Sequence, residues 1–204
     1  MKKILGILRG FPGLGRVVSG VSILETLRDS YGYDVKIISY LQGNKYLYSR
    51  GYNNLNEVTP MDYCSIGLLP TNKMGVYIHN CIREFTPDLI VVDGEPLMIK
   101  SIKISHPSIK VVALLNPADV VNSNNYKEAM DFFNEFYSLS DLAIVHGLRR
   151  IDKDSRYNEF LSISTIIRPE IIGIKNVPTN NIYCVLGGGT VNVEQQFVDS
   201  TITI

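Results

Sequence analysis

Short runs rich in β-branched residues recur along this chain of 204 residues, with helix-like segments between them. Strands that alternate with helices predict a parallel sheet, because parallel neighbours need a crossover connection. Nearly continuous apolar runs are typical of strands covered on both faces. We therefore predict an α/β fold with helices on both sides of a parallel sheet. The predicted strands lie at 3–8, 33–40, 88–94, 109–115, 141–147 and 181–189.

Two of the intervening segments have a clear helical face. One face is formed by Val17, Val21, Leu24 and Leu27. The other runs from 74 to 85, and Pro87 then prevents the helix from continuing. Residues 42–72 are rich in Asn, Gly and Tyr and have little periodicity. For this stretch we expect either two short strands with long turns or an ordered loop over the sheet edge.

Composition narrows the classes of partner and compartment. With 45% hydrophobic residues, the chain can bury at least one full core. Basic and acidic residues balance at 20 each, so the charge excess that holds a nucleic-acid backbone is missing and we expect no nucleic-acid partner. Cys64, Cys81 and Cys184 are far apart in sequence and form no CxxC pair, which suggests neither disulfides nor a metal site.

The first ten residues contain two lysines and an apolar run, as a secretory signal does. The run stops at Arg9 without a small-residue cleavage site, so we interpret it as the first strand. No apolar stretch has the length needed to span a bilayer. We expect a cytoplasmic protein and leave open peripheral contact with the inner face of the membrane.

The last part of the chain repeats the pattern with which it begins. After a proline-containing stretch, residues 181–204 supply a strand, a glycine run and a possible helix start, with Thr190 or Asn192 as N-cap. One strand and one helix do not make a core. We therefore predict a first domain at 1–167, a linker at 168–180 and, at 181–204, the truncated start of a second α/β domain. Its exposed strand edge is a candidate site of association with another molecule.

The loop "FPGLGRVVSG" at 11–20 follows the first predicted strand and contains several glycines. A dinucleotide site needs GxGxxG, but Val18 stands where the third glycine belongs, and the second strand lacks a terminal acidic residue. A P-loop needs Lys followed by Ser or Thr, and Arg16 and Val17 stand there instead. Both nicotinamide binding and NTP hydrolysis are therefore disfavoured, and we predict no cofactor.

In order and spacing, four motifs resemble those in the N-terminal half of GT-B glycosyltransferases related to the peptidoglycan N-acetylglucosaminyltransferase and the glucuronosyltransferase-like proteins. They are "GLGR" at 13–16, "VDGEP" at 92–96, "RPEI" at 168–171 and "GGGT" at 187–190. The resemblance spans nearly the whole chain. It implies a Rossmann-like acceptor domain and transfer of a sugar from a nucleotide-sugar, with UDP as the expected nucleotide, to a sugar or lipid-linked acceptor.

The resemblance also implies where the two substrates bind. The loop glycines Gly13 and Gly15 would receive the acceptor. The donor diphosphate would lie on the second domain at a glycine run, here Gly187, Gly188, Gly189 and Thr190. Most of that domain is missing from the sequence, so we expect this chain alone to have little transferase activity. Such an enzyme would invert the configuration at the anomeric carbon of the sugar and would use no metal ion.

Arg16 departs from the family pattern, in which a histidine often follows the second loop glycine and acts as a base or orients the acceptor. Arginine does not deprotonate a hydroxyl near neutral pH. It could instead neutralise a phosphate or carboxylate of a ligand. Either another residue then acts as the base, or the protein has lost catalytic activity. We include Arg16 among the candidate catalytic residues.

Polar residues follow several predicted strands, and the carboxyl ends of parallel strands share one edge of the sheet. Asp93 and Glu95 are the first candidates for the base, because two carboxylates in one turn can raise each other's proton affinity. Asp93 could equally cap the next helix. Asp119 and His146 are weaker candidates for the base, and we assign them to acceptor binding.

Two alternatives to a transferase stay open. A nucleotide-sugar hydrolase on the same scaffold would use water in place of the acceptor. A non-catalytic partner that binds or stabilises a separate glycosyltransferase subunit would agree with arginine at position 16.

Overall fold

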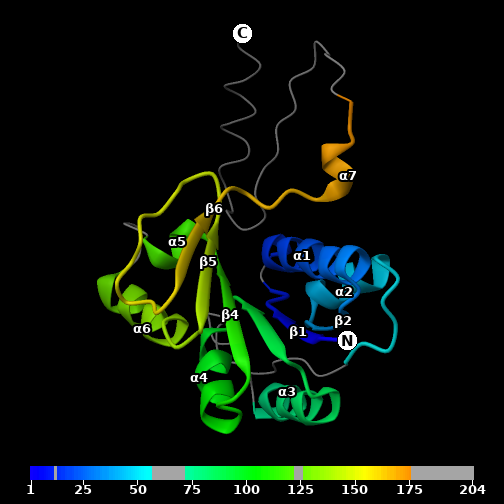
Figure 1. Ribbon diagram of the computed structural model, residues 1–204, viewed down its shortest axis with the longest axis horizontal. Coiled ribbons are helices and arrows are strands. Elements are labelled where there is room, and N and C mark those ends of the chain that lie inside the picture. The colour runs from blue at the N-terminus through cyan, green and yellow to red at the C-terminus, as the bar shows by residue number, and fades with distance from the viewer. Residues whose placement is uncertain (12, 57–71, 122–125, 176–204) are drawn as a thin grey trace, which may run out of the picture. The chain divides into compact units, whose positions relative to one another are not determined.

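A computed structural model describes residues 1–11, 13–56, 72–121 and 126–175. Residues 1–172 form one compact unit. Its centre is a six-stranded parallel sheet of order β2-β1-β3-β4-β5-β6 (Figure 1). The strands are β1 (Lys3–Leu8), β2 (Asp34–Ile38), β3 (Leu89–Asp93), β4 (Lys110–Leu115), β5 (Leu142–His146) and β6 (Phe160–Ile163).

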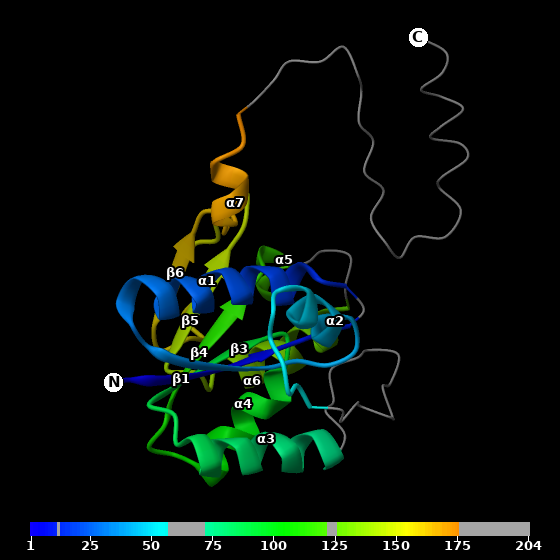
Figure 2. The same ribbon diagram turned by 90° about the vertical axis from the view of Figure 1, so that its right-hand side faces the viewer.

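Helices cover both faces of the sheet, as the apolar runs predicted (Figure 2). On one face lie α1 (Gly15–Tyr31) and α2 (Gln42–Ser49). On the other lie α3 (Asn72–Phe85), α4 (Pro96–Ser105) and α6 (Lys127–Tyr137). Two single turns, α5 (Pro117–Val120) and α7 (Pro169–Ile172), complete the described elements. The Rossmann-like parallel sheet is confirmed.

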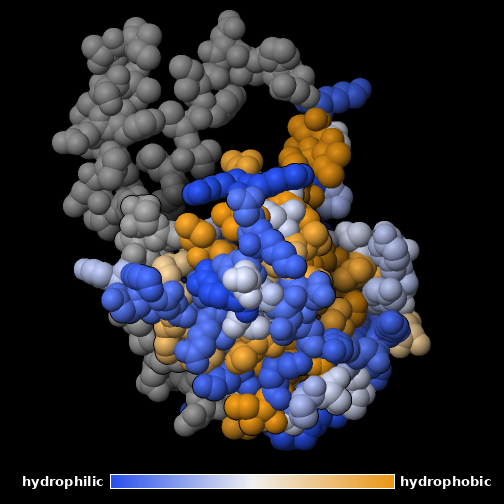
Figure 3. Space-filling view, turned by 60° about the vertical axis from the view of Figure 1, so that its left-hand side comes forward, coloured by the Kyte–Doolittle hydropathy of each residue, from blue (hydrophilic) through white to orange (hydrophobic). Residues whose placement is uncertain are grey.

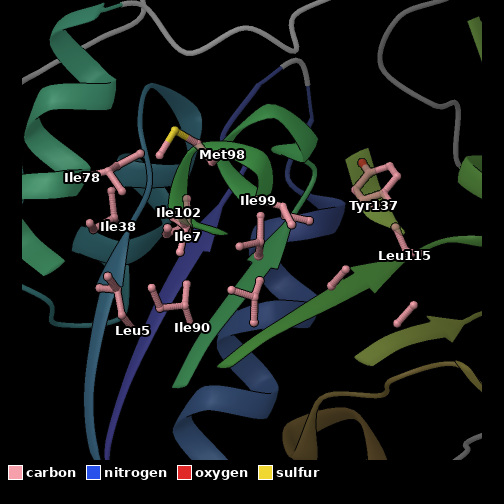
Figure 4. Close-up of a cluster of buried hydrophobic side chains, with 14 of the residues drawn as sticks. Leu5, Ile7, Ile38, Ile78, Ile90, Met98, Ile99, Ile102, Leu115 and Tyr137 are labelled. Atoms are coloured by element: carbon pink, nitrogen blue, oxygen red, sulfur yellow. The ribbon is translucent and has the colours of Figure 1, made fainter. Parts of the chain in front are cut away.

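Alternation along the strands divides the core into two clusters. Ile4 and Leu8 of β1 point toward α1. Leu5 and Ile7 point the other way, toward side chains of α3 and α4 such as Ile78 (Figure 4). The face of the molecule in Figure 3 carries hydrophilic and apolar residues next to one another. No helix among the described residues is long and apolar enough to cross a membrane.

The structure corrects the prediction for part of residues 42–72. Residues 42–49 form α2, not a strand or loop, and its Gly43 and Leu47 are buried. The remainder of that stretch from 57 to 71 lies outside the described residues. The structure also adds β6, an edge strand that the sequence did not suggest, and one helical turn inside the predicted linker. The predicted strand at 181–189, like the rest of the predicted second domain, lies outside the described residues.

Candidate functional site

The β1–α1 loop carries a pocket at the carboxyl edge of the sheet. The pocket has a volume of about 290 Å³. The described residues that line it are Arg9, Phe11, Gly13, Gly15, Arg16 and Asn116. Leu14, the residue before α1, makes no side-chain cap hydrogen bond, and the first turn of α1 has no acidic residue. The positive end of this helix dipole is therefore not offset by an acidic side chain of its own first turn.

The loop glycines differ in why the fold needs them. A Cβ on Gly10 would lie 1.8 Å from the carbonyl oxygen of Tyr40, so only glycine fits there. A Cβ on Gly13 or Gly15 would meet no atom within 4 Å, and neither residue has the positive φ that favours glycine. The turn itself therefore does not require Gly13 or Gly15, and both face open space in the pocket.

This contrast gives a first prediction. Gly10→Ala should lower the free energy of unfolding by about 1–3 kcal/mol, because the added methyl group overlaps the backbone of the β2–α2 connection. Gly13→Ala is the matched control and should leave stability within about 0.5 kcal/mol of the parent. Urea denaturation followed by circular dichroism measures both. Equal stabilities for the two variants would contradict the close packing described at Gly10.

Arg16 connects the ends of three elements of the site. Its Nη1 donates to Asp93 Oδ1 at 2.8 Å, and its Nη2 donates to Asp119 Oδ1 at 2.6 Å. Its side chain is 17% exposed. The sequence suggested a cation available to a ligand, whereas in this structure the guanidinium neutralises two carboxylates of the protein itself.

Asp93 ends β3 and is 1% exposed. Its Oδ2 is buried without a hydrogen-bond partner. Burial raises the pKa of this carboxyl to about 6, although Arg16 acts in the opposite direction. Asp93 does not cap α4, because the N-cap of that helix is Glu95, and Glu95 makes no capping hydrogen bond either. The capping interpretation of Asp93 is wrong, and its partner is Arg16.

Glu95 lies two residues beyond Asp93 but has a different partner. It is 3% exposed and its Oε1 accepts a hydrogen bond from the Tyr40 hydroxyl. Burial raises the pKa of Glu95 to about 7, and the charge of Asp93 is a smaller cause. Both carboxyls therefore have raised pKa values mainly because they are buried; Asp93 contributes to the shift of Glu95, whereas the carboxylate that acts on Asp93 is Asp119.

The pKa of Glu95 gives a second prediction. A carboxyl whose pKa is raised by folding stabilises the folded state below its unfolded pKa, and this stabilisation is lost as the pH rises through about 7. Glu95→Gln removes the buried charge and keeps an acceptor for Tyr40. We expect the variant to be more stable than the parent by about 1–3 kcal/mol at pH 8 and to show no such gain at pH 5. A gain that is the same at both pH values would contradict an ionisable Glu95 in this environment.

Asp119 and His146 lie on neighbouring elements. Asp119 Oδ2 accepts from the backbone N–H of Asn116 at 2.8 Å, within the capping box of α5, and its other oxygen binds Arg16. His146 ends β5 and is 7% exposed. Burial, and then the charge of Arg16, lower the pKa of His146, so its imidazole is neutral near pH 7. Of the sequence candidates, Arg16 thus contacts both Asp93 and Asp119 directly.

Tyr40 and Tyr137 were not among the sequence candidates. Tyr137 is 2% exposed at the end of α6, and burial together with the nearby charge of Asp119 raises the pKa of its hydroxyl well above the usual range. Tyr40 is the last residue of the second predicted strand, so the strand-end rule could have selected it. Tyr137 belongs to the apolar stripe of a helix and gave no such signal.

The donor-site prediction, Gly187 to Thr190, lies outside the described residues. Within the part of the chain that the structure describes, no group of three or more His, Cys, Asp or Glu side chains could hold a metal ion.

A scan of the sequence against protein-family models finds no match, and a search of curated proteins finds none either. Solved structures do match. UGT2 of Phytolacca americana, complexed with UDP-2fluoro-glucose and pterostilbene, has a TM-score of 0.58 at 10% identity, over 83% of this chain and 55% of that one. MnaA of S. aureus, in a structure with UDP, has a TM-score of 0.50 at 12% identity, over 71% of this chain and 38% of that one.

This chain therefore spans only part of these two proteins: 55% of the UGT2 chain and 38% of the MnaA chain. At these identities the likeness shows the fold, a Rossmann-like parallel sheet flanked by helices. The likeness supports the fold that the four sequence motifs suggested.

Proposed function

We propose that this chain is the acceptor-binding half of a glycosyltransferase that moves a sugar from a UDP-sugar to an acceptor hydroxyl. The observation that carries the proposal is the pocket of the β1–α1 loop, with Arg16, Asp93 and Asp119 joined at its edge. The chain shares its fold with UGT2, which was solved with UDP-2fluoro-glucose and pterostilbene. The carboxyl edge of an open parallel sheet is also where ligands bind in such folds.

The proposed reaction is a single displacement. A base takes the proton of the acceptor hydroxyl, the oxygen bonds to the anomeric carbon, and the bond from that carbon to the diphosphate breaks with its electrons going to the leaving UDP. Positive charge and N–H groups near the diphosphate stabilise the leaving group. Arg9, Arg16 and the start of α1 supply such groups beside the pocket.

Asp93 is our choice for the base. One of its oxygens has no partner, whereas Glu95 already accepts the Tyr40 hydroxyl. With a pKa of about 6, Asp93 is mostly ionised at pH 7 and therefore able to accept a proton. Arg16 lines the pocket and covers Asp93, so in this proposal a bound substrate draws the guanidinium away and exposes the carboxylate.

A second candidate function, a non-catalytic partner of another transferase subunit, is favoured by one observation. Of the described residues that line the pocket, none has a side chain that can act as a base near pH 7. In that case Arg16 and its two aspartates would only hold the loop in place. Substitutions at Asp93 would then affect only the stability of this protein.

The two functions differ in a pH profile, which gives a third prediction. In a transferase with Asp93 as base, kcat/KM should rise with pH along a single ionisation near pH 6 and level off above it. The assay uses UDP-sugars as donors and a protein that carries the predicted second domain in full. Absence of turnover from pH 5 to 9 would favour the partner function.

A further inference from the structure

Two of the three histidines in the sequence lie together, away from the pocket, where α3 meets the end of α4. His79 Nδ1 and His106 Nε2 are 3.2 Å apart, and the two rings stack with their centroids 5.3 Å apart. His79 belongs to α3, and His106 is the C-cap of α4. Figures 1 and 2 both show these two helices side by side on the same face of the sheet.

The distance between the two nitrogens is that of two ligands on one metal ion. With Zn–N bonds of about 2.0–2.1 Å, two nitrogens on a tetrahedral ion lie about 3.3 Å apart. Imidazole nitrogen is also a preferred ligand of zinc, copper and nickel.

Ser101 fixes the orientation of His79. The Nε2 of His79 lies 2.8 Å from Ser101 Oγ. When Nε2–H donates to this hydroxyl, Nδ1 carries the free lone pair and directs it toward His106. Metal-binding histidines commonly donate their other ring N–H to a neighbour in this way.

We propose that His79 and His106 bind one divalent transition-metal ion, Zn²⁺ in the first instance, with water in the remaining positions. Without metal, His106 Nε2–H donates to His79 Nδ1, and the two rings form a hydrogen-bonded chain with Ser101. With metal, His106 moves its proton to Nδ1, and both lone pairs face the ion. Since the ligands come from α3 and from the end of α4, the ion cross-links these helices.

The test is calorimetric titration of the 204-residue chain with Zn²⁺, in a Cys64→Ser, Cys184→Ser background that removes two competing thiols. Cys81 is 3% exposed and stays. We expect one ion per chain, bound at least about tenfold more weakly by His79→Gln and by His106→Gln. Ser101→Ala should weaken binding by about tenfold through the loss of ring orientation. His146→Gln changes the third histidine and should bind as the parent does.

A second measurement covers the case in which a histidine variant does not fold. In proton–nitrogen spectra of the parent, Zn²⁺ should shift the ring signals of His79 and His106 and leave those of His146 in place. The proposal is overturned when no binding occurs up to about 1 mM Zn²⁺, a concentration that corresponds to about 4 kcal/mol of binding free energy. It is equally overturned when binding leaves both ring signals unchanged.

Discussion

Replacing Arg16 with alanine is expected to lower the free energy of unfolding by about 3–5 kcal/mol, the usual cost of removing one partner from a buried ion pair. The side chain of Asp93 is 1% exposed and would lose its cation, and Asp119 would lose the same partner. The loss should shrink toward pH 5, where Asp93 is protonated and carries no charge to compensate. Urea denaturation at pH 5 and pH 8 measures both effects.

Arg50→Ala is the matched control for Arg16→Ala. Arg50 also bridges two carboxylates, those of Glu25 and Glu170, but its side chain is 32% exposed and that of Glu170 is 50% exposed. Exposed pairs of this kind contribute about 0–1 kcal/mol. A double variant, Arg16→Ala with Asp93→Asn, should recover part of the lost stability because no buried charge is left alone. An Arg16→Ala loss no larger than the Arg50→Ala loss would show that the buried ion pair is not a stabilising contact.

The second large effect is expected in catalysis. On the proposed function, Asp93→Asn should lower kcat by about 10²–10⁴, the range supplied by a general base, and leave KM nearly unchanged. The amide keeps the shape of the carboxyl but has no basic oxygen. Initial rates of sugar transfer, measured with a protein that carries the predicted second domain in full, provide the test.

Glu95→Gln is the control that separates the two buried carboxyls. Glu95 accepts the Tyr40 hydroxyl, whereas Asp93 is bonded to Arg16 of the pocket, so the Glu95 variant should retain most of the parent kcat. A large loss in Glu95→Gln with a small loss in Asp93→Asn would transfer the role of base to Glu95. Equal, small losses of kcat in both variants would exclude both carboxyls as the base.

The sheet could be predicted because its signal is local. Five of the six predicted strands correspond to β1 to β5, and the interior strands β1, β3 and β4 carry nearly continuous apolar runs because both faces of the sheet are covered there. β6 has only partly buried and exposed residues and lies at the sheet edge, so its sequence carries no such run. α2 was missed because Gly43, Asn44 and Tyr46 have low helix propensity, and packing of Leu47 against the core stabilises it instead.

The candidate site could be predicted only as a region. The rule that strand ends share one edge brought Asp93, Asp119 and His146 to the correct side of the sheet. Which groups bond to one another depends on side-chain directions between residues far apart in sequence. Arg16 and Asp93 are 77 residues apart, and Tyr40 and Glu95 are 55 apart. Burial, which determines the raised pKa values of Asp93 and Glu95, also follows from the packed structure and not from their spacing.

The most direct test of the proposed acceptor site is transfer of labelled sugar from a panel of UDP-sugars. It is measured for the parent and for Gly15→Val, each in a protein that carries the predicted second domain in full. A Cβ at position 15 meets no atom of the fold, so the valine side chain should extend into the pocket without unfolding the protein. We predict product from the parent and a loss of at least about 100-fold in kcat/KM for the variant, equivalent to about 3 kcal/mol of transition-state binding. Parent-level transfer by a folded Gly15→Val protein, or no transfer by the parent from any UDP-sugar, would contradict the proposal.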